Sequence, residues 1–324
     1  MKPMHLLLAL GMALGSVTAH AQGAPYPSKP IRLVVGFAPG GAADQVARSM
    51  SDAFSKALGQ PVVVDNKPGN GSSIAAEIVA KAPADGYTLL IASPSSISVN
   101  PALNPKLGYT PKELLAVSKM TTSPLVLAVN PATNLKSIPE LIAAAKKDPG
   151  KLNFSSSGNG SAPHLGAALF MQITGVQMTH VPYKGGAPAI QSVMAGETQV
   201  TFGTSPSVLP QAGPGGRLRA IAVSTRERSP LVPDLPGMRE AGLPAYNIEF
   251  WYGMFVPVGT PPAVVKRIYD ATVSAMQVPS VKAALAREGT EVSISSSPTD
   301  FERFLVEDEK FWVSLVKSAN VKVD

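Results

Sequence analysis

The sequence predicts an α/β protein built from two lobes, and three observations support this. The chain has 324 residues, which exceeds the usual size of one small domain. Short runs rich in β-branched residues alternate with segments of helical periodicity, which is typical of mostly parallel sheets covered by helices. This alternation begins near residue 31 and starts again near residue 125, so a second lobe is expected to follow the first.

The first lobe is predicted to open with a strand over 31–35, followed by a loop with Gly40 and Gly41. Val46, Met50, Phe54 and Leu58 then recur at helical spacing, and Gly59 is expected to end that helix. The next elements are predicted as a strand over 62–64, a loop over 66–71, a helix over 74–81 and a strand over 87–92.

The second lobe repeats the pattern. Strands are predicted over 125–129, 152–155, 178–181, 199–203 and 218–224, and helices over 138–147, after the loop at 157–164, and over 187–195. The proline-rich stretch 231–236 is interpreted as a surface connection.

The apolar stretch 250–262 predicts a strand that crosses back to the first lobe, followed by a helix with proline at its start. Lobe 1 is therefore assigned to 22–123 plus 250–324, and lobe 2 to 124–249. Rotation about the two crossings, near 122–125 and 249–255, is expected when a ligand bridges the lobes. In the last helix, which opens at Ser297, four side chains are predicted to be core contacts: Phe304, Phe311, Trp312 and Leu315.

Residues 1–21 have the features of a signal peptide: Lys2 near the start, an apolar run over 6–15 and the small-x-small site Ala19-His20-Ala21. The apolar run is too short to span a bilayer, and no later segment approaches 18 uninterrupted apolar residues. The sequence has no cysteine, which excludes disulfides, thiolate metal sites and a lipid-modified cysteine. We expect export by a cleaved signal peptide and residence in the periplasm.

The formal net charge is +6, and the charged residues are scattered along the chain. No basic stripe interleaved with aromatic residues is present, so a nucleic-acid partner is not expected. Only His164 and His180 remain after the predicted cleavage, so a histidine metal site is not expected either. No cofactor is predicted.

Three glycine loops, at 37–44, 157–164 and 183–188, each follow a predicted strand and open a predicted helix. The first N–H groups of a helix have no partner inside it and carry partial positive charge, so such loops suit an anion. None of them matches a phosphate loop or a dinucleotide fingerprint. Asp44 is expected to cap the first helix or to pin its loop, because a carboxylate facing an anionic ligand would repel it.

Ser161 and His164 leave two interpretations open. The sequence G-N-G-S-A at 158–162 lacks the last glycine of a nucleophile elbow, and no acidic residue lies nearby to orient His164. A triad completed by a distant acid would make the protein a serine hydrolase. A capped helix, with Ser161 at the N-cap and His164 donating to the same anion, is favoured instead.

The motifs together resemble one family. These are the 37–44 loop, G-Q-P-V-V-V-D-N-K-P-G-N-G at 59–71, D-G-Y-T-L-L-I at 85–91, G-N-G-S-A-P-H-L from Gly158, H-V-P-Y-K-G-G-A-P-A from His180 and W-Y-G-M-F-V-P-V-G-T-P from Trp251. They resemble the Bug (TctC-like) receptors, the solute-binding components of tripartite tricarboxylate transporters. The resemblance implies a type II periplasmic binding protein with no catalytic role, a monomer that captures a small carboxylate for membrane permease subunits. A sensor partner in a signalling system is the alternative.

The resemblance also implies which residues bind the ligand. They are Phe37, Gly40, Gly41, Ala42 and Asp44 in the first loop; Ser93 and Ser95 in a lining loop; and, in lobe 2, Ser157, Gly160, Ser161, His164, Lys184, Gly185, Gly186, Ala187 and Thr204. The chain has Gly203 where many family members have Asp. This change makes an amino-acid ligand less expected, although Thr204 offers part of the polar contact.

Overall fold

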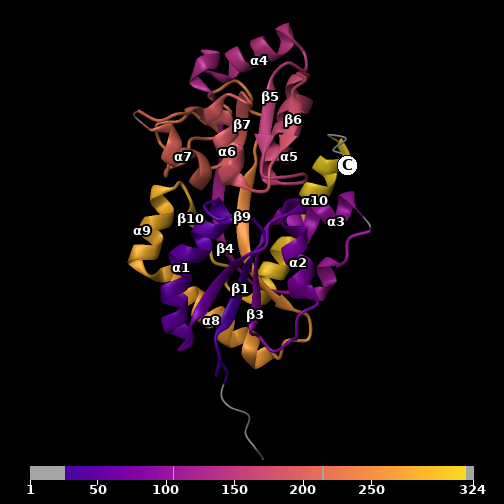
Figure 1. Cartoon of the computed structure of the whole chain (residues 1–324), viewed down its shortest axis with the longest axis vertical. Helices are drawn as coiled ribbons and strands as arrows, with labels where there is room; N and C mark the ends of the chain where they lie inside the picture. Colours follow the sequence, from indigo (N-terminus) through magenta and orange to yellow (C-terminus); the bar gives the residue numbers. More distant parts are fainter. Residues whose placement is uncertain (1–25, 105, 214, 319–324) are drawn as a thin grey trace, which may run out of the picture.

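The computed structural model describes residues 26–104, 106–213 and 215–318, so the predicted signal peptide at 1–21 lies outside the described residues. Two α/β lobes lie one above the other along the long axis of the molecule (Figure 1). Two long strands, β4 (Leu114–Val129) and β9 (Glu249–Pro257), run through both lobes. The predicted two-lobed architecture with two crossing strands is confirmed.

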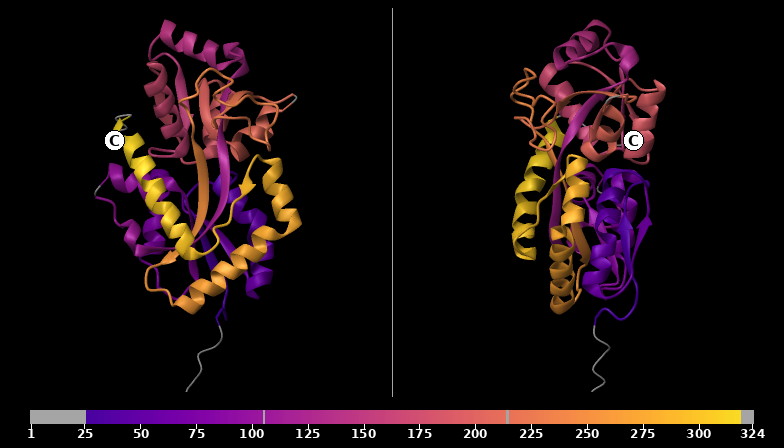
Figure 2. Two further views of the ribbon diagram at one scale, coloured as in Figure 1. Left: turned by 180° about the vertical axis from the view of Figure 1, so that it is seen from behind. Right: turned by 90° about the vertical axis from the view of Figure 1, so that its left-hand side faces the viewer.

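The first lobe is built around β1 (Ile31–Val35), which pairs in parallel with β2 (Val62–Asn66) and β3 (Thr88–Ala92). Its other elements are α1 (Ala42–Leu58), η1 (Asn70–Ser72), α2 (Ser73–Ala80), the π-helical turn η2 (Ser95–Val99), α3 (Asn100–Leu103), η3 (Pro111–Glu113), α8 (Pro262–Gln277), α9 (Pro279–Arg287), β10 (Glu291–Val292) and α10 (Pro298–Ser318). In Figure 2, α10 runs along the crossing strands on the side away from α1.

The second lobe is built around β5 (Asn153–Ser156), which pairs in parallel with β6 (Thr179–Pro182) and β7 (Val200–Thr204). It also contains η4 (Pro131–Thr133), α4 (Ile138–Lys147), α5 (Ala162–Thr174), α6 (Gly186–Ala195), α7 (Ser205–Ala212) and β8 (Arg219–Val223). Each predicted strand of this lobe is present; the ends shift by one residue except in β4, which begins well before the predicted residue 125.

The two lobes share one mixed sheet, in the order β2-β1-β3-β9-β4-β7-β5-β6, with β8 and β10 also paired to β4. Strand β4 is antiparallel to β9 as far as Pro124, and from Leu125 onward it is antiparallel to β7 and β8. Parallel pairing is therefore confined to the outer strands, because the crossing strands run against their neighbours. The predicted "mostly parallel" sheets describe each lobe away from these crossings.

Helix α1 shows how the sequence pattern becomes a packed element. Val46, Met50, Phe54 and Leu58 are at most 3% exposed and form the apolar face of the helix. Gly59 ends the helix in the left-handed conformation, with φ of 79°.

The prediction of core side chains failed at one position in α10. Trp312 and Leu315 are buried, but Phe311 is 45% exposed and lies edge-on to Trp312. The prediction that Phe311 is a core residue was wrong.

Several elements had no clear pattern in the sequence. The strand was predicted to begin at residue 125, whereas β4 begins at Leu114 and includes the polar run Thr121–Ser123. Helix α7 contains Pro210, which conceals its helical periodicity. Across the described ranges, no helix is long and apolar enough to cross a membrane.

Candidate functional site

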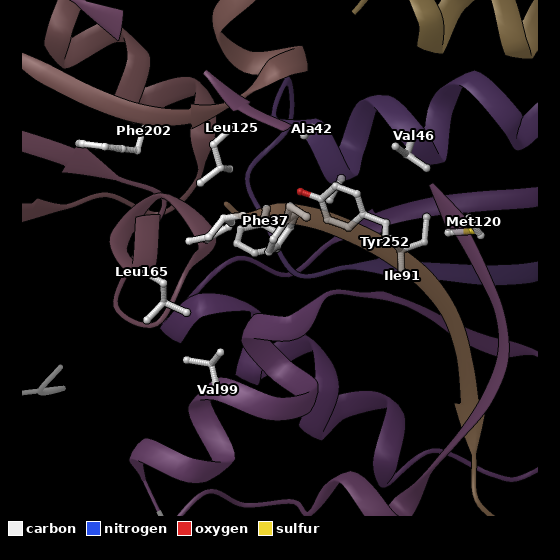
Figure 3. Close-up of a cluster of buried hydrophobic side chains, with 14 of the residues drawn as sticks. Phe37, Ala42, Val46, Ile91, Val99, Met120, Leu125, Leu165, Phe202 and Tyr252 are labelled. Carbon is white, nitrogen blue, oxygen red and sulfur yellow. The ribbon is translucent and has the colours of Figure 1, made fainter. Parts of the chain in front are cut away.

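A small cavity lies where the lobes meet. It is lined by Phe37, Gly41, Ala42, Ser157, Pro163, Gly186, Ala189, Ile190, Thr201, Gly203, Thr204, Ser207 and Tyr252. Figure 3 shows Phe37, Ala42 and Tyr252 close to one another at this junction. The cavity therefore draws on the first lobe, the second lobe and the crossing strand β9.

Four helices begin at this cavity. The lining residues include Gly41 and Ala42 at the start of α1, Pro163 in the first turn of α5, Gly186 at the start of α6, and Thr204 at the N-cap of α7. Among the described residues, no side chain caps any of these four N-termini. Their first N–H groups and the positive ends of four helix dipoles are thus directed at one space.

The cavity wall carries no charge of its own within the described part of the chain, because its lining consists of apolar, glycine, serine, threonine and tyrosine residues. No group of three or more potential metal ligands occurs among the described residues. The arrangement can thus hold an anion through backbone N–H groups and hydroxyls.

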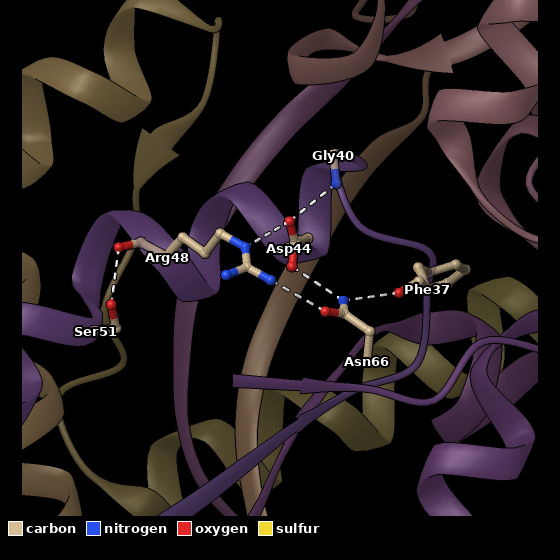
Figure 4. A network of polar contacts seen from close by, with 6 residues as sticks. All are labelled: Phe37, Gly40, Asp44, Arg48, Ser51 and Asn66. Carbon is tan, nitrogen blue, oxygen red and sulfur yellow. Dashed lines mark hydrogen bonds and ion pairs between the residues drawn. The ribbon is translucent and has the colours of Figure 1, made fainter. Parts of the chain in front are cut away.

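The loop of the first lobe is held by a network behind the cavity (Figure 4). Asp44 Oδ2 accepts hydrogen bonds from the Gly40 N–H at 2.9 Å and from Arg48 Nε at 2.9 Å, and Asp44 Oδ1 accepts one from Asn66 Nδ2 at 3.0 Å. The Asn66 amide also donates to the Phe37 carbonyl at 3.0 Å. The predicted role of Asp44 in pinning its loop is confirmed.

This network also keeps Asp44 ionised. Burial by itself would raise the pKa of the carboxyl, but the hydrogen bonds from Arg48, the Gly40 N–H and Asn66 outweigh it and lower the pKa below the ordinary value. Asp44 does not line the cavity. Its charge is paired with Arg48 instead of facing the space where an anion would lie.

The loop of the second lobe at 157–164 is supported by stacked rings. His164 and His180 stack with ring centres 3.9 Å apart, and Phe154 stacks on His180 at 4.9 Å. The Gly160 N–H donates to His164 Nδ1 at 3.2 Å, and His180 Nε2 lies 2.6 Å from Ser156 Oγ. Burial lowers the pKa of His164 to about 4, and burial together with the neighbouring His164 lowers that of His180 to about 3. Both rings are therefore neutral near pH 7.

His164 occupies the first turn of α5, as predicted, but it lies behind the loop and does not line the cavity. Ser161 holds the N-cap position with extended dihedral angles, yet its hydroxyl makes no capping bond. This hydroxyl is buried without any hydrogen-bond partner among the described residues, His164 included. The hydrogen bond that would activate a serine nucleophile is thus absent from the described structure.

Glycines allow the lobes to touch on both sides of the cavity. On one side the Ala38 N–H donates to the Lys184 carbonyl at 3.3 Å, and a Cβ added to Gly41 would lie 3.6 Å from the Gly186 nitrogen. On the other side a Cβ added to Gly160, which has φ of +67°, would lie 2.0 Å from Asn100 Oδ1. The lobes are closed in this structure, and these glycines make contacts between lobes in addition to shaping helix starts.

The predicted site residues fall into three groups. Those lining the cavity are Phe37, Gly41, Ala42, Ser157, Gly186 and Thr204. Those on loops beside it are Gly40, Asp44, Gly160, Ser161, His164, Lys184, Gly185 and Ala187, of which Lys184 is exposed and Gly185 packs against Ala38. Ser93 and Ser95 are fully buried and do not line the cavity. Contact of these residues with a ligand remains a prediction.

The sequence interpretation missed seven lining residues: Pro163, Ala189, Ile190, Thr201, Gly203, Ser207 and Tyr252. Of these seven residues, only Ala189 had a local signal in the sequence, because the small residues at 186–189 extend the predicted loop at 183–188. Gly203 has a packing explanation, because a Cβ there would lie 2.5 Å from Val208 Cγ2 and 3.3 Å from Ile190 Cδ1. These two side chains fill the space that an aspartate would need.

Comparisons with known proteins agree with this geometry. Residues 46–321 match the family described as the tripartite tricarboxylate transporter family receptor. Protein BugT of Bordetella pertussis is 34% identical over 322 residues, which cover 98% of each chain.

Two solved structures are similar along nearly the whole chain. The R. palustris protein Rpa4515 with adipate is 33% identical with a TM-score of 0.88, over 92% of this chain and 99% of that chain. MatC (Rpa3494) from Rhodopseudomonas palustris with bound malate is 31% identical with a TM-score of 0.84, over 90% and 100% of the two chains. The fold is thus that of periplasmic solute-binding proteins, and the chain belongs to the Bug (TctC-like) family of tripartite tricarboxylate transporter receptors.

Proposed function

We propose that this protein captures a small carboxylate in the cavity between its lobes and delivers it to the permease subunits of a tripartite transporter. The observation that carries the proposal is the convergence of four uncapped helix N-termini, those of α1, α5, α6 and α7, on a cavity whose described lining has no charged side chain. Such a site favours an anion and needs no cofactor.

The ligands of relatives indicate the kind of anion. The similar proteins Rpa4515 and MatC were solved with adipate and malate, which are both carboxylates. In this proposal the first carboxylate accepts hydrogen bonds from backbone N–H groups near residues 41–42 and 186–187. The hydroxyls of Thr204, Ser207 and Tyr252 contact the rest of the ligand.

Release requires the lobes to open, and the crossing strands are the proposed hinge. Strand β4 changes partner between Pro124 and Leu125, within the predicted crossing at 122–125. The proposed lobes are 22–123 plus 250–324, and 124–249. We further propose periplasmic residence after cleavage of residues 1–21, and a monomeric state.

A thermal-shift screen tests the proposal. The screen covers dicarboxylates, tricarboxylates, amino acids and aromatic acids, with neutral sugars as the control. A ligand bound only by the native state adds about 2.7 kcal/mol of stability at a hundred times its Kd. At least one acid should raise the melting temperature, whereas stabilisation by sugars alone would contradict an anion site.

X-ray scattering tests the hinge with the acid found in that screen. The radius of gyration should fall when this acid saturates the protein, because the open form closes around it. An unchanged radius of gyration at saturation would rule out the proposed rotation.

A further inference from the structure

A second pocket adjoins the cavity at the outer edge of the junction between the lobes. It is lined by Gly40, Gln45, Ala187, Ile190, Gln191, Met194, Pro206, Ser207, Pro210, Gln211 and Arg217. Ile190 and Ser207 line both spaces. The two spaces thus lie side by side and share a wall formed by these two side chains.

The outer pocket differs from the inner cavity in charge. Arg217 is its one charged lining residue in the described part of the chain, so no carboxylate there neutralises the guanidinium. Arg217 is exposed, and none of the ion pairs found between described residues includes it. Its neighbour Leu218 is buried and donates its N–H to the Gln211 carbonyl at 3.0 Å, which fixes this segment against α7.

Amide side chains complete the pocket. Gln45 lies in the second turn of α1, and its Oε1 is buried without a hydrogen-bond partner among the described residues. Gln191 and Gln211 line the pocket from α6 and α7. Because the two ends of an amide are a donor and an acceptor of similar shape, rotation of Gln45 would present NH₂ to an acceptor in this pocket. Because this oxygen is buried, a ligand can reach the Gln45 amide only after the side chain rotates.

We propose that the outer pocket binds a second carboxylate of the ligand, with Arg217 as its counter-ion. This inference rests on the proposed function and makes it more specific: the first carboxylate lies at the helix N-termini, and the chain of the acid passes Ile190 and Ser207. A guanidinium binds a carboxylate through two parallel hydrogen bonds, which distinguishes a carboxylate from a methyl end of equal length. Arg217 would then select dicarboxylates over monocarboxylates.

Calorimetry on matched acids tests the proposal. Straight-chain dicarboxylates from four to seven carbons are titrated beside monocarboxylates of the same chain length, on the wild-type protein, Arg217→Gln and Lys147→Gln. Lys147 is exposed and belongs to α4, which lies at the end of the second lobe away from the first lobe (Figure 1), so its variant removes the same charge from the second lobe. A charge-assisted hydrogen bond corresponds to about a tenfold to hundredfold change in affinity.

Arg217→Gln should weaken the best dicarboxylate by about tenfold to a hundredfold and leave monocarboxylates unchanged, while Lys147→Gln should change neither. An equal loss for both kinds of acid, or no loss in Arg217→Gln, would overturn the outer site and leave the proposed function standing. If the wild-type protein bound no acid at all, the proposed function itself would fail, and this inference with it.

Discussion

The loops that face the cavity from the two lobes are held in shape by opposite kinds of chemistry. The loop at 37–44 depends on charge, since the ionised Asp44 gathers Arg48, Asn66 and the Gly40 N–H. The loop at 157–164 depends on neutral rings, since His164 stacks on His180, His180 stacks on Phe154, and burial opposes protonation of both histidines. In both loops these supports lie behind the backbone.

This difference shows how a site without charged lining residues can be kept rigid. A carboxylate is acceptable beside an anion site only because Arg48 neutralises it and the loop separates it from the cavity. Protonation of both histidines in the second loop would oppose their stacking, because two charged rings 3.9 Å apart repel each other. The loops should therefore respond differently to mutation and to pH.

The largest expected effect concerns the place where loops of both lobes meet. A Cβ added to Gly186 would lie 2.5 Å from Ser207 Oγ, and Gly41 Cα is 3.9 Å away, while the backbone conformation is one that other residues adopt. Gly186→Val should therefore displace Ser207 from the cavity wall within the second lobe, and its added bulk also faces Gly41 of the first lobe. Affinity should fall by more than about a hundredfold in calorimetry, with an unchanged circular dichroism spectrum.

The matched control is Gly213→Val, because a Cβ at Gly213 has no described atom within 4 Å and its φ is −73°. This variant should bind normally. Normal binding by Gly186→Val would mean that the loops of the two lobes need not meet for the ligand to be held.

The hydrogen bonds of Asp44 in the first loop should contribute more to the free energy of unfolding than an exposed side-chain contact does. Asp44→Ala removes an acceptor that serves three donors, so the free energy of unfolding should fall by about 1.5–3 kcal/mol. Urea denaturation measures this as a lower midpoint at constant slope. Asp52→Ala changes an exposed carboxylate of the same helix and should stay within about 0.5 kcal/mol of the wild type. Equal effects of the two variants would contradict the pinning role of Asp44.

The buried neutral rings of His164 and His180 in the second loop should make the free energy of unfolding depend on pH. The ordinary pKa of histidine is about 6.5, and the folded values are about 4 for His164 and about 3 for His180. Between these values the unfolded chain binds more protons, so the free energy of unfolding should fall as pH decreases below 6.5, by at most about 1.4 kcal/mol per pH unit for each ring.

His180→Phe keeps an aromatic ring in the stack and should make that decline shallower. Burial raises the pKa of Asp308 to about 6, so this carboxyl acts in the opposite direction, with stability lost as pH rises. It does so in both proteins, and the difference between their pH profiles of stability isolates the histidine. Parallel profiles would show that His180 does not contribute.

The smallest expected effect belongs to the crossing strand. Tyr252 lines the cavity, and Figure 3 shows its hydroxyl directed toward the start of α1. Tyr252→Phe should weaken ligand binding by about 0.5–1.5 kcal/mol, the worth of one neutral hydrogen bond. Tyr246→Phe is the control, because that hydroxyl donates to the Gly166 carbonyl in the core. Tyr246→Phe should lower the free energy of unfolding and leave ligand affinity unchanged. If Tyr252→Phe instead lowered stability and left affinity unchanged, Tyr252 would be excluded from the site.

Local patterns were sufficient to predict many of the elements. Helix α1 follows from the spacing of Val46, Met50, Phe54 and Leu58, and its end from Gly59, because burial of one face needs that period. The strand over 31–35 was predicted from its β-branched residues, and the glycine loops from their place between a predicted strand and a predicted helix. Asp44 could be assigned its role from chemistry alone, since its partners Gly40 and Arg48 lie within four residues of it.

Other features arise only when distant segments meet. Tyr252 and Ser207 reach the cavity on β9 and α7, and neither stands in a local motif that signals a ligand. The stacking of His164 on His180 depends on the register of β5 beside β6, and the contacts of Gly41 and Gly160 depend on lobe closure. The sequence determined the fold class and the glycine loops, and it predicted an anion site, because these follow from backbone chemistry at short range. Only the tertiary structure decided which side chains form the walls and which glycines touch across the lobes, because those contacts join segments far apart in the chain.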